Sequence, residues 1–257
     1  MLYDTHAHLN DEAFAEDAEA ALVRALDAGV TKINIVGCDP QMSAKAVEMA
    51  EKYDAVYAVV GIHPSDADKY DEAVEEQLRQ WAALEKVVAI GEIGLDYHFE
   101  DDVDHDIQRE VFRRQLCLAS ELNMPVVIHS RDAMDDTVRI IREEQPEGGF
   151  RGVFHCFSGS WEQVKVCLEL GFYIGFDGPL TFKNSRKLPK VASEMPLERL
   201  LIETDCPYMA PEPVLGRRNE PAYVKHIAAK VAQLRGISPE DAGRISYENG
   251  CRLFGLE

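Results

Sequence analysis

The chain alternates short apolar runs with longer segments in which apolar residues recur at helical spacing. The short runs are rich in Val, Ile and Leu and therefore predict buried strands, whereas the longer segments predict amphipathic helices. Eight apolar runs occur, at residues 2–6, 32–36, 56–62, 87–93, 125–129, 152–155, 172–176 and 200–204. Helical patterns occupy residues 11–28, 41–52, 71–84, 106–122, 133–143 and 161–170, a weaker one 182–193, and two more 221–234 and 239–254.

This order of elements predicts an α/β fold with a parallel sheet, closed as a (β/α)8 TIM barrel. Gly29 and Gly171 stand where a helix is expected to end in a left-handed residue, which supports the proposed boundaries. Such a barrel needs about 250 residues as one unit, and no linker or repeat interrupts the 257 residues. We therefore expect one domain, residues 1–257, with the Pro-rich stretch 206–221 as a long loop over one face.

Composition narrows the class of protein. The chain is 46% hydrophobic and 28% charged, as in ordinary globular proteins. The first residues lack the basic and apolar regions of a signal peptide, and no apolar run approaches the roughly 20 residues that span a bilayer. The six cysteines include no C-x-x-C pair, which favours free thiols in a reducing compartment. We expect a cytoplasmic protein without membrane association, and no feature indicates an obligate protein partner.

The formal net charge of −19 opposes nonspecific binding to duplex nucleic acid. Such binding depends on Lys and Arg side chains that displace counterions from phosphates. The charge is still compatible with a phosphate ester that approaches a locally cationic metal centre.

Polar residues that can bind metals follow several of the apolar runs. The first run leads into His6 and His8, which project to the same side of a strand because side chains alternate. Four more candidates lie in or after later runs: Glu92, His129, His155 and Asp205. In a barrel the carboxyl ends of the strands meet at one mouth, where a cation would offset the desolvation of these groups. This ligand set suits Mg, Mn, Zn or Fe; the alternative is a set of hydrogen-bonded polar groups.

Further candidates for chemistry lie beside these positions. His63 ends the third run and is a candidate for substrate contact or proton transfer, or else an ordinary strand-end histidine. Glu203 precedes Asp205 by two residues and is a candidate to support the ligands. Arg131 follows His129 and has the geometry to pair with a phosphate. The other reading of Arg131 is an ion pair with a nearby aspartate: Asp132, Asp135 or Asp136.

Aromatic residues also lie within these segments. Tyr97, Phe157 and Tyr208 are placed to stack on nucleic acid bases or, alternatively, to pack at the rim of the barrel. Both interpretations remain open from the sequence.

Six separated motifs give the chain a family resemblance over essentially its whole length. They are LYDTHAHLN (2–10), GIHP (61–64), GEIGLDYH (91–98), MPVVIHSRDAMDD (124–136), HCFSGS (155–160) and LLIETDCPY (200–208). The chain resembles the TatD family of metal-dependent deoxyribonucleases, which belong to the amidohydrolase-like metal barrels. The resemblance implies two divalent metal ions with activation of the Mg²⁺ type. It also implies exonuclease action on DNA, often on single strands from the 3′ end.

The same resemblance implies a role for each candidate ligand. One metal would be bound by four side chains, with a carboxylate bridging to a second metal: His6, His8, Glu92 and Asp205 hold the first, and Glu92, His129 and His155 the second. As a mechanistic hypothesis, Asp205 orients a water and takes its proton, and Glu92 and His63 complete the catalytic set.

One position departs from the family pattern. The family commonly has an Arg before the Gly of an R-G-x-x-N-x-P run, and here Leu215 precedes Gly216. A phosphate contact at that position is therefore in doubt. Arg217 and Arg218 are candidates to replace it, so that the expected substrate contacts are Arg131, Arg217, Arg218 and Tyr97.

Two other functions remain open. One is a metal-dependent hydrolase of a small amide, lactone or phosphoester, which the acidic net charge favours because long polyanions are repelled. The other is a metal-stabilised barrel that binds a partner without catalysis. The open mouth expected for two metals argues against the second alternative, because structural metal sites are closed.

Overall fold

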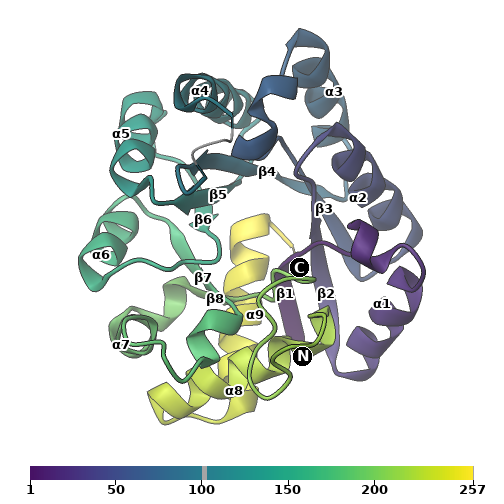
Figure 1. The fold of residues 1–257 in the computed structure, drawn as a ribbon, viewed down its shortest axis with the longest axis vertical. Coiled ribbons are helices and arrows are strands. Elements are labelled where there is room, and N and C mark those ends of the chain that lie inside the picture. Colours follow the sequence, from purple (N-terminus) through teal and green to yellow (C-terminus); the bar gives the residue numbers. More distant parts are fainter. Residues whose placement is uncertain (100–102, 257) are drawn as a thin grey trace.

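The computed structural model describes residues 1–99 and 103–256, in which eight parallel strands form one sheet in chain order (Figure 1). Each strand pairs with the next one along the chain. The strands are β1 (Leu2–Ala7), β2 (Val30–Val36), β3 (Val56–Val60), β4 (Val87–Asp96), β5 (Val126–Arg131), β6 (Gly152–Phe154), β7 (Tyr173–Phe176) and β8 (Leu200–Ile202).

Contacts just beyond β8 bring the sheet back to β1. The amide of Asp205 donates to the carbonyl oxygen of His6 at 2.9 Å, and the amide of His8 donates to that of Cys206 at 2.8 Å. A parallel bridge joins Ala7 to Cys206. The strands therefore form a nearly closed barrel, which confirms the predicted (β/α)8 fold.

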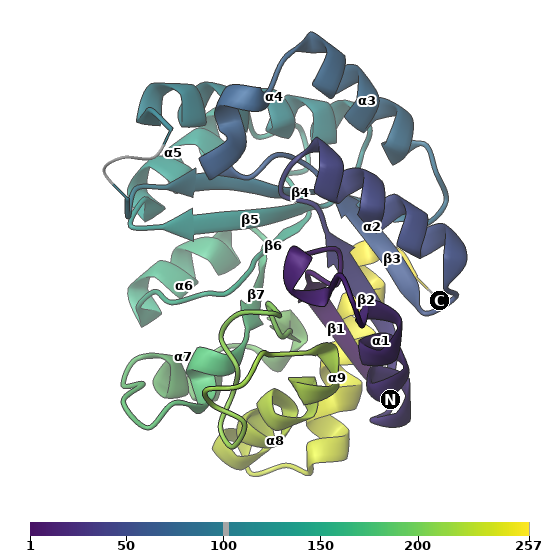
Figure 2. The same ribbon diagram turned by 45° about the vertical axis from the view of Figure 1, so that its right-hand side comes forward.

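The helices lie around the outside of the sheet, except for α9, which lies inside their ring (Figures 1 and 2). They are α1 (Ala18–Asp27), α2 (Pro40–Lys52), α3 (Glu72–Ala82), α4 (His105–Glu121), α5 (Met134–Glu144), α6 (Trp161–Glu169), α7 (Leu188–Glu194), α8 (Val224–Arg235) and α9 (Pro239–Phe254). Short 3-10 helices supplement them: η1 (Glu12–Phe14), η2 (Pro64–Lys69), η3 (Gly178–Thr181), η4 (Leu197–Arg199) and η5 (Pro221–Tyr223). Among the described residues, no helix combines the length and apolarity needed to cross a membrane.

Some boundaries differ from the sequence-based expectation. The helix predicted over residues 11–28 is divided into η1 and α1, because the Asp11 carboxylate accepts from the amide of Ala13 and starts a separate 3-10 turn. The weak pattern at 182–193 corresponds to the seven-residue α7. Strand β4 continues to Asp96, beyond the predicted end at residue 93, because it pairs with β5 as far as Arg131. All six cysteines are free thiols, as expected.

The barrel has one apolar core outside the sheet and another inside it. The outer core lies between the strands and the surrounding helices. The inner core contains Tyr3, Val59 and Val127 from the strands, together with Phe254 from α9. Helix α9 packs against the first residues of β1, where a Cβ at Gly250 would lie only 2.7 Å from the Tyr3 ring. Helix α9 therefore covers the amino-terminal end of the barrel and leaves the carboxyl end of the strands for a site.

Candidate metal centre

The six ligand candidates come together at the carboxyl end of the barrel. They belong to five different strands or to the residues that directly follow them, and all but His129 and Asp205 are fully buried. The six are His6 and His8 at β1, Glu92 in β4, His129 in β5, His155 after β6 and Asp205 after β8.

Glu92 lies between two pairs of histidines. Its Oε2 is 3.3 Å from His6 Nε2 and 3.8 Å from His8 Nε2. Its Oε1 is 2.8 Å from His129 Nδ1 and 2.6 Å from His155 Nε2. The two oxygens of one carboxylate thus face different ligand pairs, which is the arrangement of a carboxylate that bridges two positions.

Within each pair the ring nitrogens point at each other. His6 Nε2 and His8 Nε2 are 3.1 Å apart, and His129 Nδ1 and His155 Nε2 are 3.2 Å apart. The Nδ1 of His8 faces the carbonyl oxygen of Val36 at 2.9 Å and must donate to it, because a carbonyl only accepts. This contact fixes the His8 ring with Nε2 toward the centre, as a metal ligand requires. Burial lowers the pKa of His8, but Cys38 and Asp205 outweigh it and raise that pKa well above its usual value.

Asp205 completes the first group. Its Oδ1 lies 3.4 Å from His8 Nε2 and 3.7 Å from His6 Nε2. Ligand atoms of these three residues all lie within 4.8 Å of one another, and so do those of His6, Glu92 and His155.

The charges of the centre follow from burial and from facing groups. Burial, together with the nearby His155, lowers the pKa of His6 to about 4, so that the ring is neutral at pH 7. Burial alone would raise the pKa of Glu92, but His155, His129 and His6 outweigh it and hold that pKa well below its usual range. Asp205 has a lowered pKa because the hydrogen bond with His8 and the neighbouring histidines overcome the effect of burial. Both carboxylates are therefore ionised.

Asp96 holds His129 in place and was not among the predicted site residues. Its Oδ2 lies 3.0 Å from His129 Nε2, and its backbone is fixed by hydrogen bonds with the Gln108 side chain. Burial opposes protonation of His129, but Asp96 and Glu92 raise its pKa to about 9. A carboxylate on the far nitrogen orients the ring toward the centre, as is usual for metal-bound histidines. The position of Asp96 in the GEIGLDYH motif, four residues after Glu92, is the sequence feature that could have indicated it.

His63 faces the centre with a proton rather than a lone pair. Its Nδ1 accepts from the amide of Ser65 at 3.1 Å, so the proton of the neutral ring is on Nε2. That Nε2 lies 3.7 Å from Glu92 Oε1. Burial, together with the neighbouring His129, lowers the pKa of His63 to about 3. His63 is thus a neutral hydrogen-bond donor at the edge of the centre.

A second layer of buried acids lies behind the ligands. Glu203 is fully buried and accepts from the amide of Cys156 at 2.6 Å, while its Oε1 lies 3.9 Å from His155 Nδ1. Asp177, which follows β7 and was not predicted, accepts from the Cys156 thiol at 3.1 Å. Burial raises the pKa of Glu203 well above its usual range.

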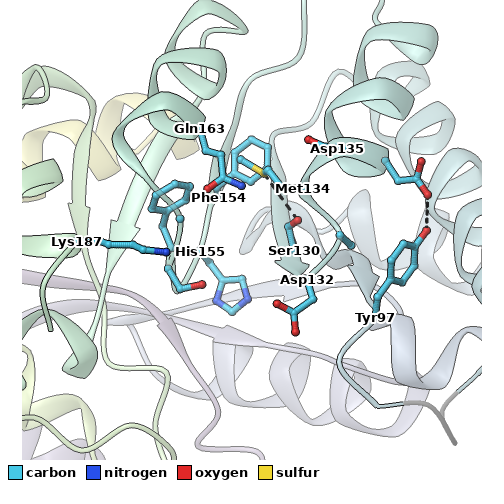
Figure 3. A pocket seen from close by; sticks show the side chains of 14 residues that line it. Tyr97, Ser130, Asp132, Met134, Asp135, Phe154, His155, Gln163 and Lys187 are labelled. Atoms are coloured by element: carbon cyan, nitrogen blue, oxygen red, sulfur yellow. Dashed lines mark hydrogen bonds between the residues drawn. The ribbon is translucent and has the colours of Figure 1, made fainter. Parts of the chain in front are cut away.

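A cavity of about 450 Å³ opens beside His155 (Figure 3). Phe154, Phe157 and Met134 form part of its wall, together with several acidic and polar side chains. Lys187 extends toward it from the side opposite Tyr97, as Figure 3 shows. The cavity therefore connects the histidine cluster with a surface cation.

The predicted substrate contacts lie in different surroundings. Tyr97 lines the cavity, but its hydroxyl donates to Asp136 at 2.8 Å. The guanidinium carbon of Arg131 lies 5.0 Å from the Phe99 ring centroid. Arg218 is bound to Asp17 by two hydrogen bonds of 2.7 Å, whereas Arg217 and Leu215 are exposed on the loop after β8.

The side chains that meet here have the chemistry of ligands for divalent cations. The Nδ1 atoms of His6 and His155 are buried and have no hydrogen-bond partner among the described residues. The close polar contacts of both rings are therefore made through Nε2, which faces Glu92 in each case. The four imidazoles are typical ligands of Zn or Fe, and the two ionised carboxylates also suit Mn or Mg.

A (β/α)8 barrel with histidines and carboxylates at the carboxyl ends of its strands defines the class of metal-dependent hydrolases. Residues 3–255 match the family model described as TatD related DNase, and the chain belongs to this family. It is 48% identical to the uncharacterised metal-dependent hydrolase YabD of Bacillus subtilis, over 99% of both chains. It is 35% identical to the 3′-5′ ssDNA/RNA exonuclease TatD of Escherichia fergusonii, also over 99% of both chains.

The fold comparison agrees with the family assignment. The crystal structure of YJJV, a TatD homologue of Escherichia coli K12, has a TM-score of 0.92 and 34% identity, covering 100% of this chain and 98% of that one. The predicted family resemblance is thereby confirmed, and the protein is a metal-dependent hydrolase of the TatD family.

Proposed function

We propose that this protein is an exonuclease that hydrolyses phosphodiester bonds of single-stranded DNA from the 3′ end with two divalent cations. The observation that carries the proposal is the position of Glu92, whose Oε2 faces His6 and His8 while Oε1 faces His129 and His155. A carboxylate in this position would serve as a ligand to two cations, as phosphodiester hydrolysis with two metals requires. The exonuclease named among the relatives supports this substrate class.

The residues that would hold the cations divide into two groups. His6, His8 and Asp205 would bind one cation, and His129 and His155 the other, with Glu92 shared between them. When bound, the cations would polarise the scissile phosphate and lower the pKa of an attacking water.

The protein would provide the proton transfers and the orientation of the substrate. Asp205 is ionised, and its Oδ1 lies at the edge of the centre, where it would accept the proton of the attacking water. His63 would donate a hydrogen bond from Nε2 to a phosphate oxygen, because its low pKa keeps the ring neutral. The Phe157 ring in the cavity wall would contact the terminal base.

The direct test is hydrolysis by the metal-loaded protein. End-labelled single-stranded DNA, RNA and bis-p-nitrophenyl phosphate would each be incubated with Mg²⁺, Mn²⁺ or Zn²⁺. A ladder that shortens from the 3′ end of DNA is expected, and Asp205→Asn should abolish it. Absence of hydrolysis for every substrate and metal would exclude the nuclease and favour a non-catalytic binding protein.

A small-molecule hydrolase is a second candidate, supported by the acidic side chains around the cavity. Asp132, Asp135 and Asp136 all line it, and the net charge of the chain is −19. These charges disfavour a long polyanion and favour a compact ester, amide or lactone. Turnover of the small diester without degradation of DNA or RNA would support this alternative.

A further inference from the structure

Residues 178–193, which lie between Asp177 and Glu194, have a charge opposite to that of the chain. The ionisable side chains of residues 178–193 are all Lys or Arg, and none is acidic. The whole chain, in contrast, has 46 acidic and 27 basic residues. The four cations of residues 178–193 lie within eight positions: Lys183, Arg186, Lys187 and Lys190. We refer to residues 183–190 as the basic segment.

The cations of the basic segment are available for a ligand. Lys183, Arg186 and Lys187 are exposed, and none of them is within 4.0 Å of a carboxylate of the described residues. Lys190 reaches only Glu194, at 4.0 Å. In contrast, arginines elsewhere, such as Arg113 with its two glutamate partners, are neutralised by ion pairs.

The basic segment lies next to the candidate metal centre. Lys187 lines the cavity that also contains His155, and Figure 3 shows its side chain directed toward that cavity. The preceding turn η3 is joined to the loop after β8, because Thr181 Oγ1 accepts from the amide of Glu212 at 2.9 Å. The cations are therefore carried by a segment that is fixed to the rim of the barrel mouth.

We propose that the basic segment binds the backbone phosphates of a single-stranded nucleic acid whose end occupies the metal centre; this inference rests on the proposed function. Exposed Lys and Arg side chains bind phosphates without regard to sequence. A small phosphoester in the cavity would not extend to Lys183 and Arg186. A narrow basic strip on an acidic protein suits a few phosphates of one strand, whereas a duplex would also meet the acidic surface around it.

Binding as a function of salt tests the inference. The variant K183Q/R186Q/K187Q removes three cations, and K45Q/K225Q/K230Q removes three from helices α2 and α8 as a matched control. Fluorescence anisotropy of metal-loaded protein with a phosphorothioate single-stranded oligonucleotide would give Kd without hydrolysis. Three phosphate contacts contribute about −2 to the slope of log affinity against log salt. We expect the test variant to lose this slope and the control to keep it.

Two results in this assay would overturn the inference. One is a slope and an affinity that do not change in the test variant. The other is an equal loss in the control, because net charge rather than the basic segment would then determine binding.

Hydrolysis separates this inference from the proposed function. Turnover of bis-p-nitrophenyl phosphate should be unchanged in K183Q/R186Q, which leaves the cavity-lining Lys187 in place, while degradation of single-stranded DNA at low enzyme concentration should fall at least several-fold. Equal losses on both substrates would overturn the inference, because the segment would then act on the reacting group itself. If the wild-type protein bound the oligonucleotide through this segment but hydrolysed no diester, the proposed function alone would fail.

Discussion

The two carboxylate oxygens of Glu92 serve different histidine pairs, so this side chain cannot be replaced without affecting both. Glu92→Gln keeps the shape of the side chain but removes its charge, and an amide cannot bridge two cations as a carboxylate does. We expect turnover to fall by at least about 100-fold while the fold is retained, because each group loses a charged ligand. Steady-state kinetics and circular dichroism would measure this, and a folded variant with the full hydrolytic rate would show that Glu92 has no such role.

Asp96 contacts a ligand candidate, His129, rather than the centre itself, and the role of this contact can be tested. Asp96→Asn weakens the contact that orients His129, whose Nε2 lies 3.0 Å from the carboxylate. Loss of such a partner typically lowers metal affinity by about 10- to 100-fold, which Mn²⁺ titration by calorimetry would detect. Asp132→Asn is the matched control, because its carboxylate pairs with the exposed His98. Equal affinities in the two variants would contradict the positioning role of Asp96.

At the scale of single residues, the convergence of the six ligand candidates could be predicted because each stands in or just after an apolar run. Asp96, Ser65 and Asp177 could not be predicted in the same way. Their significance depends on which ring nitrogen or thiol they face, and this relation arises only when separate strands meet. Arg218 shows the converse, since the sequence marks a cation but not the Asp17 carboxylate that binds it.

Strands β4 and β5 determine together where Glu92 and His129 stand. Gly94 pairs with His129 in this part of the sheet, and its φ of +143° is rarely adopted by other residues. A Cβ at this position would lie 1.9 Å from the carbonyl oxygen of His129. Gly94→Ala should therefore displace the strands and lower the free energy of unfolding by about 2 kcal/mol or more. Urea denaturation would measure the loss; Gly148→Ala, at a positive φ but in open space, is the control.

An ion pair joins the loop after β8 to the start of α1, and its effect depends on pH. Hydrogen bonds from Arg218 are the main cause that lowers the pKa of Asp17 from 3.8 to about 2. The pair therefore stabilises the native state fully above pH 3.8, and this contribution is lost as the pH falls through about 2. Because both side chains are partly exposed, we expect Asp17→Asn to cost less than about 1 kcal/mol at neutral pH.

Chemical denaturation at several pH values would test the sign. The difference between the wild type and Asp17→Asn should be largest near neutral pH and should shrink toward pH 2. A difference that grows on acidification would contradict the assigned role of the ion pair.

At the scale of elements, order and type could be predicted from the periodicity, but some boundaries could not. The division of the first helical pattern depends on a single carboxylate, that of Asp11, which caps a short turn. The extra length of β4 depends on hydrogen bonds with β5, which no local pattern reveals. Helix η2 was missed because its 3-10 turn of six residues lacks a helical apolar repeat.

For the whole molecule, the cations should contribute to stability. Chelation would leave the buried ligand cluster without its partners, whereas saturation with metal stabilises only the folded state. At about 100 times Kd the gain is about 2.7 kcal/mol, which corresponds to a rise in Tm of roughly 5–10 °C for a chain of this size. Differential scanning calorimetry with EDTA and then with excess Mn²⁺ would measure it. A Tm that is the same in both conditions would contradict a resident metal centre.

The closed barrel could be predicted as a whole because eight alternations of strand and helix admit few other arrangements. That a helix covers the amino-terminal end of the barrel could not be predicted. Helix α9 carries an ordinary amphipathic pattern, and only the packing of Phe254 against Tyr3 reveals that it closes the inner core.

The way the barrel is closed also affects how the chain folds during synthesis. Strand β1 has a neighbour on each side, and one of these, β8, begins only at Leu200. Helix α9, which packs against β1, begins at Pro239. At the ordinary rate of translation, roughly 10 to 40 seconds separate these segments. In that interval the edge of β1 is unpaired. The ligand candidates His6 and His8 on this strand also lack Asp205. We therefore expect the nascent chain to capture its metal late, after the last strand has left the ribosome.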